Sequence, residues 1–189
     1  MDVIEMHREA GTEFVRQVEA VKPDQWTAPT PCADWDVRAL VNHVVGEERW
    51  VVPLLAGRTI ADVGDTLDGD LLGDDPAAAA TRAAAEAQAA TAEAVPVVHL
   101  SYGDEDTTEY LRQLVADLLI HGWDLAVAIG STPHMHPEVV DEVAAWFEQR
   151  ETMYRDGGAI AARVPNGPDP AARLLGAFGR DASWTARGA

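Results

Sequence analysis

Apolar residues along this chain recur mostly at spacings of three and four, which is the period of an amphipathic helix. The pattern predicts a first helix over residues 3–21, which ends before Pro23 because proline disfavours a helical conformation in the preceding residue. A second helix is predicted over residues 37–56, with Asp36 as its N-cap and Gly57 just beyond its end.

The helical pattern continues through the second half of the chain. An alanine-dense segment predicts a third helix over residues 77–94, because alanine has the highest helix propensity. A longer apolar run predicts a fourth helix over residues 109–129, followed by Gly130 as a C-terminal signal. A fifth helix is predicted over residues 137–155 and a short final helix over residues 171–178.

Two connections lack this period. Residues 58–76 are polar and acidic, and they predict a long loop. Residues 96–108 predict a short extended segment that turns at Gly103. Because the chain is rich in alanine and poor in aromatic residues, we expect an all-α fold, and the length suits a single domain over residues 1–189.

The fourth predicted helix carries two metal-capable side chains on a largely apolar face. Asp117 and His121 are four residues apart, which places their Cβ atoms about 5–6 Å from each other on one face. One divalent ion can bridge such a pair, since ligand bonds to zinc are about 2.0–2.2 Å long. The alternative is that both side chains hydrogen-bond to other buried groups, because unpaired polar groups cost free energy to bury.

The second predicted helix adds another histidine. His43 shares the apolar face of that helix with Leu40 and Val44. His43, Asp117 and His121 would then supply three protein ligands and leave one position open, which is the arrangement of a catalytic rather than a structural zinc site.

Two carboxylates lie close to these three residues in sequence. Glu47 is one turn after His43, and it could be a fourth ligand, a partner that orients His43, a general base, or simply a solvated side chain. Asp124 follows His121 by three residues. It could accept the second ring N–H of a histidine, or it could pair with a surface arginine.

Other reactive side chains are expected to be structural. His7 is predicted to be at the surface or partly packed. Cys32 has nothing basic beside it in the sequence and is predicted to be a small buried hydrophobe rather than a ligand or a nucleophile. Trp35 is expected to cover the end of the helices, and the alternating His134 and His136 are expected to bind metal only adventitiously.

The formal net charge of −18 excludes several classes of partner. Nucleic-acid binding requires a basic footprint, and anionic membrane surfaces attract basic segments. No apolar stretch reaches the ~20 residues of a membrane-spanning helix, and the acidic first residues differ from a signal peptide. With a single cysteine no internal disulfide can form, so we expect a cytoplasmic protein that binds neither nucleic acid nor membrane.

Three segments carry a resemblance to a known family. PTPCADWDVRALVNHVVGE, LLIHGWDLAVAIG and the closing LLGAFGRDASW resemble the DinB/YfiT-like metal-binding superfamily. The nearest branch is the N-terminal domain of mycothiol-dependent maleylpyruvate isomerase with its uncharacterised actinobacterial relatives. The resemblance runs from Phe14 to Trp184. It implies a four-helix bundle with a divalent metal near one end, held at the positions of His43, Asp117 and His121.

The chain departs from that family at one ligand position. The isomerase branch typically has Glu, and the wider superfamily often has His, where this chain has Asp117. Ligation there is either direct or through a bridging water.

The resemblance also implies an activity, namely a metal-dependent thiol transferase or isomerase acting on a small electrophilic substrate. The metal would be zinc or nickel, and the thiol would be mycothiol. The alternative is a non-catalytic metal-binding protein, or a homodimeric interaction protein with a vestigial site. The two differ in whether the open ligand position faces a pocket of useful volume.

Overall fold

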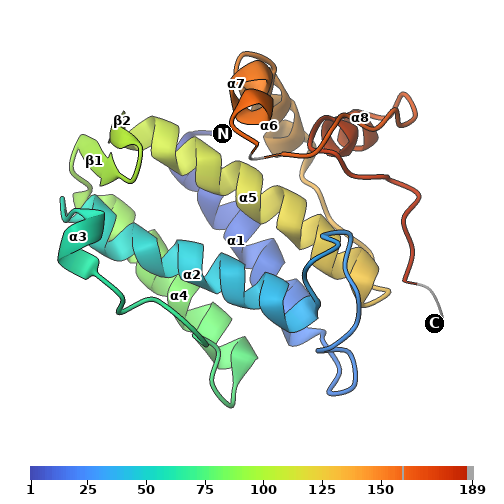
Figure 1. Ribbon diagram of the computed structural model, residues 1–189, viewed down its shortest axis with the longest axis horizontal. Coiled ribbons are helices and arrows are strands. Elements are labelled where there is room, and N and C mark those ends of the chain that lie inside the picture. Colours follow the sequence, from blue (N-terminus) through green and yellow to red (C-terminus); the bar gives the residue numbers. More distant parts are fainter. Residues whose placement is uncertain (159, 187–189) are drawn as a thin grey trace.

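The computed structural model describes residues 1–158 and 160–186, and its longest helices pack around a shared core (Figure 1). Each of the first and second long helices contacts both the third and the fourth. These four elements are α1 (Val3–Glu19), α2 (Val37–Leu55), α4 (Pro76–Ala90) and α5 (Thr107–Ala128). Their bounds agree with the predicted helices to within a few residues, because strong apolar periodicity is a local signal.

Aspartate side chains fix where these helices begin. Asp2 and Glu5 form a reciprocal capping box at the start of α1. Asp36 accepts a hydrogen bond from the backbone N–H of Ala39 at 2.8 Å, which confirms it as the N-cap of α2. The sequence therefore predicts where the helix that carries His43 begins.

The core between the long helices is built from their apolar stripes. Its buried members include Phe14, Val18, Leu40, Val41, Val44, Ala83, Leu118 and Leu125. Full burial of one such Leu, Val or Phe side chain contributes about 1.5–3 kcal/mol. The alanines of α4 bury little area each, but their small size lets that helix pack closely against α1 and α2.

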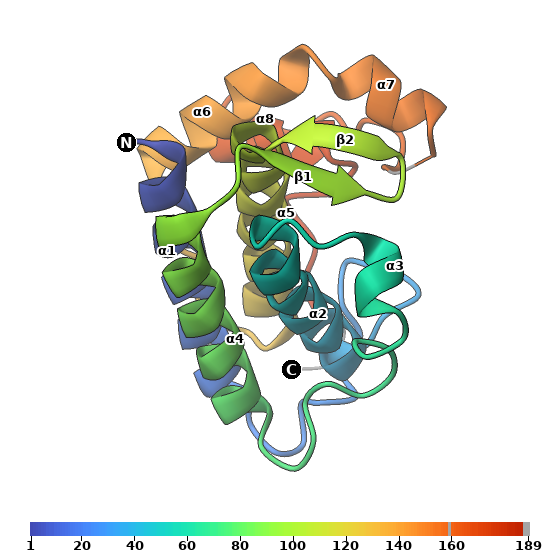
Figure 2. The same cartoon turned by 90° about the vertical axis from the view of Figure 1, so that its left-hand side faces the viewer.

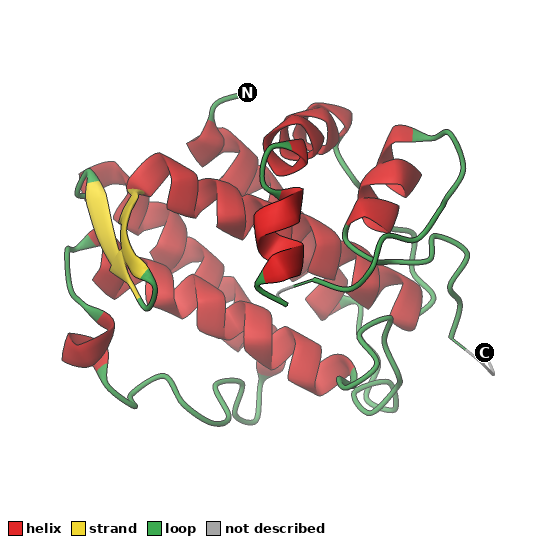
Figure 3. Ribbon diagram, turned by 45° about the horizontal axis from the view of Figure 1, so that its top comes forward, coloured by secondary structure: helices red, strands yellow, loops and turns green. Residues whose placement is uncertain are grey.

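A β-hairpin corrects the expectation of an all-α fold. Strands β1 (Val97–Leu100) and β2 (Gly103–Asp106) pair in antiparallel register at one end of the long helices (Figure 3). The fold is therefore mostly helical with a small two-stranded sheet. Val98 is fully buried, and β1 contacts α2 and α5, so tertiary packing stabilises an extended segment that its β-branched residues favour. The chain turns at Ser101 and Tyr102, just ahead of the predicted position.

The predicted helix over residues 137–155 is wrong as a single element. It is divided into α6 (Pro137–Glu148) and α7 (Glu151–Asp156). At the break, the guanidinium group of Arg150 donates hydrogen bonds of 2.5 and 2.8 Å to Glu109 of α5. This long-range contact anchors the chain where local periodicity alone would continue the helix.

The C-terminal helices form a second core on the side of α5 away from α2 and α4 (Figure 1). α6 packs on α5 and on α8 (Pro170–Ala177), and the rings of Phe147 and Phe178 stack with centroids 4.1 Å apart. The short elements α3 (Ile60–Val63) and the 3-10 turn at Thr91–Glu93 complete the chain. Among the described residues, none of the helices has both the length and the apolar character that crossing a membrane requires.

Candidate metal centre

The three residues singled out on α2 and α5 converge in space. Asp117 Oδ2 lies 3.4 Å from His43 Nε2, and Asp117 Oδ1 lies 3.4 Å from His121 Nε2. The two imidazole rings meet edge to face, with centroids 5.2 Å apart. One ligand atom from each residue can be chosen so that all three lie within 4.8 Å of one another.

These separations fit a divalent ion. Four ligand atoms placed tetrahedrally at about 2.1 Å from zinc are about 3.4 Å from each other. Asp117 therefore reaches both histidines despite being one methylene shorter than glutamate. Its Oδ2 atom is buried and accepts no hydrogen bond from any residue in the described part of the chain. An acceptor left in this state has electron pairs available for an ion.

In the metal-free protein, Asp117 and His121 shift each other's pKa. Burial would raise the pKa of Asp117, but the charge of His121 and hydrogen bonds from both histidines more than offset this and lower it. Burial would lower the pKa of His121, but the Asp117 carboxylate and hydrogen bonds to its neighbours raise it well above its usual value. A metal ion at this position must therefore displace a proton from His121.

Asp124 contacts a histidine and an arginine, the two kinds of partner that the sequence left open, but the arginine is largely buried rather than at the surface. Its Oδ2 atom lies 3.0 Å from His121 Nδ1, and the Arg180 guanidinium group donates to Oδ2 at 2.9 Å and to Oδ1 at 3.0 Å. The Asp124 side chain is completely buried. Burial alone would raise the pKa of Asp124, but the hydrogen bonds from His121 and Arg180 lower it. An ionised carboxylate only accepts, so Nδ1 of His121 keeps a proton, and Nε2, which faces Asp117, is the nitrogen that can bind an ion once the ion has displaced the Nε2 proton.

Cys32 is the main correction to the predicted site. It is half-buried, and its Sγ atom lies 3.3 Å from Asp124 Oδ2 and 3.9 Å from His121 Nδ1. The guanidinium group of Arg180 is 3.0 Å from the sulfur. Nothing basic is near Cys32 in the sequence because Arg180 comes from 148 residues further along the chain. Cys32, His121 and Asp124 also form a second set of atoms close enough to share an ion.

A pocket of about 700 Å³ opens beside the cluster. Its polar end contains Cys32, His43, Glu47, Asp117, His121 and Arg180. Its aromatic wall contains Trp35, Tyr110, Trp146, Tyr154 and Phe178. The volume falls in the range of about 300–1,000 Å³ that is typical of small-molecule sites. Trp35 thus lines a cavity, with its ring 4.7 Å from that of His43, whereas the sequence predicted that it only covers the helix ends.

Glu47 lines the same pocket but lies outside both of the possible ligand clusters in the described residues. Burial and the negative charge of Asp117 raise its pKa. The hydroxyl group of Tyr110 is also buried in this pocket without a partner among those residues, and burial raises its pKa well above the usual value. Both groups hold their protons more tightly than exposed side chains do.

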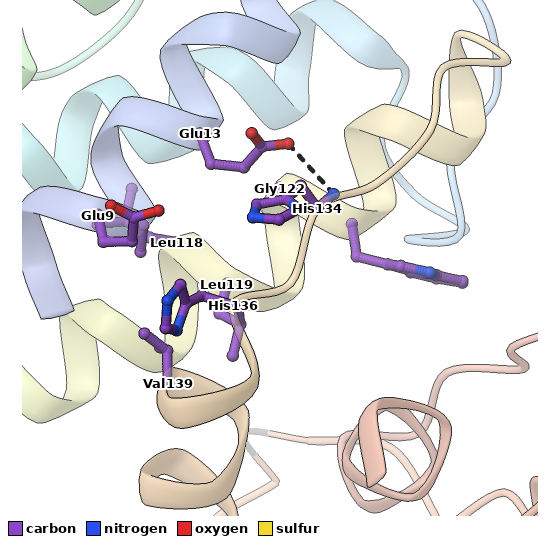
Figure 4. A pocket seen from close by; sticks show the side chains of 10 residues that line it. Glu9, Glu13, Leu118, Leu119, Gly122, His134, His136 and Val139 are labelled. Atoms are coloured by element: carbon purple, nitrogen blue, oxygen red, sulfur yellow. Dashed lines mark hydrogen bonds between the residues drawn. The ribbon is translucent and has the colours of Figure 1, made fainter. Parts of the chain in front are cut away.

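The other histidines lie elsewhere. His99 pairs with Asp104 within the hairpin at 2.7 Å. His134 and His136 border a cavity of about 10 Å³ beside Glu9 and Glu13, space for about one water molecule (Figure 4). Within the part of the chain that is described, their ligand atoms do not gather into a cluster of three.

His7 contradicts the prediction of a surface or partly packed residue. It is 2% exposed, and its Nε2 atom lies 2.9 Å from Oε1 of Glu48. The sequence shows His7 near a helix start among charged residues, and it becomes buried only in the tertiary structure, where it meets Glu48 of α2.

Comparison with known proteins places these observations in a family. Residues 7–126 match the model described as mycothiol maleylpyruvate isomerase N-terminal domain. The uncharacterized proteins MT0763 and Rv0738 of Mycobacterium tuberculosis are each 30% identical over 187 residues, covering 95% of this chain and 98% of each relative. No solved structure matches the chain. His43, Asp117 and His121 lie inside the matched segment, whereas part of the aromatic wall and Arg180 lie beyond it.

Proposed function

The chain belongs to the family of mycothiol maleylpyruvate isomerase N-terminal domains, and from this premise we propose that it binds a divalent metal and transfers a thiol to, or isomerises, a small electrophile. The observation that carries the proposal is the convergence of His43, Asp117 and His121 at one end of a large pocket. In this proposal the four long helices form the DinB-like bundle, and the protein works in the cytoplasm, where thiols stay reduced.

The donor set supports a choice of metal. Two imidazole nitrogens and one carboxylate oxygen suit zinc first and nickel second. A divalent ion held there is a Lewis acid that lowers the pKa of a bound thiol or water. In this proposal the thiol is mycothiol, and the chain's own residues hold, orient and protonate the reactants.

Asp124 acts as a positioning residue. By accepting the Nδ1–H of His121 it fixes the tautomer that directs Nε2 toward Asp117. Arg180 holds Asp124 from the opposite side, so rotation of the carboxylate would break two sets of hydrogen bonds. We propose that this chain of contacts keeps the imidazole of His121 in place when the ligand exchanges.

Glu47 is the proposed proton carrier. It lines the pocket one turn beyond His43, and its raised pKa brings the carboxyl group closer to neutral pH. A group with such a pKa can accept the proton of an incoming thiol and return it to the product. Its position outside the ligand clusters favours this role over that of a fourth ligand.

The substrate is proposed to have an apolar or aromatic body. Trp35, Trp146 and Phe178 provide flat apolar surface within the pocket. Several of these wall residues lie outside the segment that matches the family. We therefore propose that the metal end is common to the family and that the region of residues 146–180 selects the substrate of this protein.

Metal content tests the proposal directly. Elemental mass spectrometry of tag-free protein should show near-stoichiometric zinc or nickel, and His43→Ala and His121→Ala should each lose it. His99→Ala is the matched control, because His99 lies in the hairpin and outside the pocket. The loaded protein should then consume mycothiol with an aromatic electrophile. Metal binding without thiol consumption would instead favour a non-catalytic metal-binding protein.

A further inference from the structure

A second cavity lies on another side of α2. Glu47 lines the metal pocket, whereas the next residue, Glu48, lines a groove of about 500 Å³ where α1 and α4 run side by side (Figure 2). Consecutive residues of a helix point about 100° apart. None of the described residues that line one cavity also lines the other. α2 therefore presents one carboxylate to each of two separate sites.

The floor of this groove contains a buried pair of polar side chains. His7 and Glu48 are 2% and 3% exposed, and Nε2 of His7 lies 2.9 Å from Oε1 of Glu48. In the neutral tautomer that donates Nε2–H to Glu48, Nδ1 is left as an acceptor. The metal cluster uses neither residue.

Three residues that line this groove each carry a buried acceptor atom without a partner. These atoms are Nδ1 of His7, Oε2 of Glu48 and Oε1 of Gln88, and none of them hydrogen-bonds to any described residue. Buried acceptors without donors cost free energy, and the great majority of such atoms in proteins are hydrogen-bonded. Their gathering along one groove indicates that a hydrogen-bond donor is missing from it.

The groove also has room for a ligand. Its sides include Gly11, Ala84 and Ala85, and a Cβ atom built on Gly11 would meet nothing within 4 Å among the residues described. At the rim, Arg16 is paired with Glu13, while the exposed Arg8 and Glu19 carry opposite charges. Glu48 is therefore the buried acidic side chain of the groove.

We propose that this groove binds the primary ammonium group of a small organic amine. An ammonium group has three N–H donors and no acceptor, which matches three acceptors that need donors. Its positive charge offsets that of Glu48. A hard divalent cation is less suited, because such ions require several carboxylates or many oxygen ligands, and among the described residues only one buried carboxylate lines the groove.

Isothermal titration calorimetry of the full-length protein with n-butylammonium chloride tests this proposal. Butan-1-ol, which lacks the charge, and butyltrimethylammonium, which lacks N–H donors, are the matched ligands and should not bind. Glu48→Gln should weaken binding of butylammonium at least about tenfold, because it removes a charge-assisted hydrogen bond. Gln88→Leu should weaken it several-fold, whereas Glu86→Gln, which removes a charge from α4 outside the groove, should not.

Other outcomes would overturn the proposal. These are no binding to the wild type, equal binding of butyltrimethylammonium, or binding that neither Glu48→Gln nor Gln88→Leu weakens. If Glu48→Gln fails to fold by circular dichroism, Gln88→Leu decides, because Gln88 is only partly buried. Amine binding should persist in His43→Ala, so failure of the metal site leaves this test intact. Zinc that displaces the amine from His43→Ala would make the groove a metal site instead.

Discussion

Two histidine–carboxylate sites share helix α2, and they differ in how their polar atoms meet. At the candidate metal cluster, Asp117 lies 3.4 Å from each of two imidazole nitrogens. In the groove between α1 and α4, His7 and Glu48 form a direct hydrogen bond of 2.9 Å. The first spacing leaves a point between the atoms that an ion can occupy, whereas in the second the two facing atoms already contact each other directly.

The contacts behind each histidine distinguish the two sites further. His121 is held from behind by Asp124, which is itself held by Arg180. Nothing comparable supports His7 in the described residues, since its Nδ1 atom has no partner. Residue type alone therefore does not make a metal site. Convergence of lone pairs and an oriented imidazole distinguish the cluster from the buried pair.

The largest expected effect is on metal affinity when a proposed ligand is removed. His121→Ala should weaken zinc binding by more than about 100-fold, beyond the 10–100-fold typical of outer-shell partners. Competition with a zinc chelator measures this. His7→Ala removes a buried histidine from the other site and should leave the affinity unchanged. A comparable loss in both variants would remove the distinction between the two sites.

The second effect concerns the support behind His121. Asp124→Asn keeps a side chain of the same shape but removes the charge that Arg180 and His121 share, and it should weaken zinc binding about 10–100-fold. The same competition assay applies, with Asp62→Asn in the distant helix α3 as the control. Unchanged affinity in Asp124→Asn would show that packing alone orients the imidazole.

The third effect concerns stability at the groove. Glu48→Ala should lower the free energy of unfolding by about 1–2 kcal/mol, because it leaves a buried histidine without its partner. Replacing the pair together, as His7→Phe with Glu48→Leu, should be less harmful, since no polar group is then left unpaired. Urea denaturation measures both. A double variant less stable than Glu48→Ala would contradict this account.

The smallest effect is the pH dependence of the metal-free protein. The pKa of His121 is raised on folding. Its pairing with Asp117 therefore stabilises the folded state fully at pH values below the unfolded pKa of about 6.5, and this stabilisation is lost as the pH rises through the folded pKa. The pKa of Asp117 is lowered on folding. Its contribution to stability is therefore present at pH values above the unfolded pKa of about 3.9 and is lost as the pH falls through the folded pKa.

Urea midpoints of the metal-free protein should therefore fall as pH rises above about 6.5, and His121→Ala should flatten this slope. Zinc affinity should change in the opposite direction and increase with pH, because the ion displaces a proton from His121. A metal-free protein whose stability increases steadily from pH 6.5 to 9 would contradict the assignment.

Much of the candidate site can be predicted from the spacing of residues within single helices. The apolar stripes of α2 and α5 predict the faces on which His43, Asp117 and His121 lie. Within α5, a spacing of four places Asp117 and His121 on the same face. The helix starts at Asp36 and the C-terminal signal at Gly130 are likewise local, because caps act within one turn.

What the sequence could not supply are the contacts between segments far apart in the chain. Arg180 meets Cys32 across 148 positions, His7 meets Glu48 across 41, and Arg150 meets Glu109 where α6 ends. Periodicity reports which face of an element is apolar, but it does not report which other element covers that face. Only tertiary packing decided that one histidine joins an open cluster and another is buried against a glutamate.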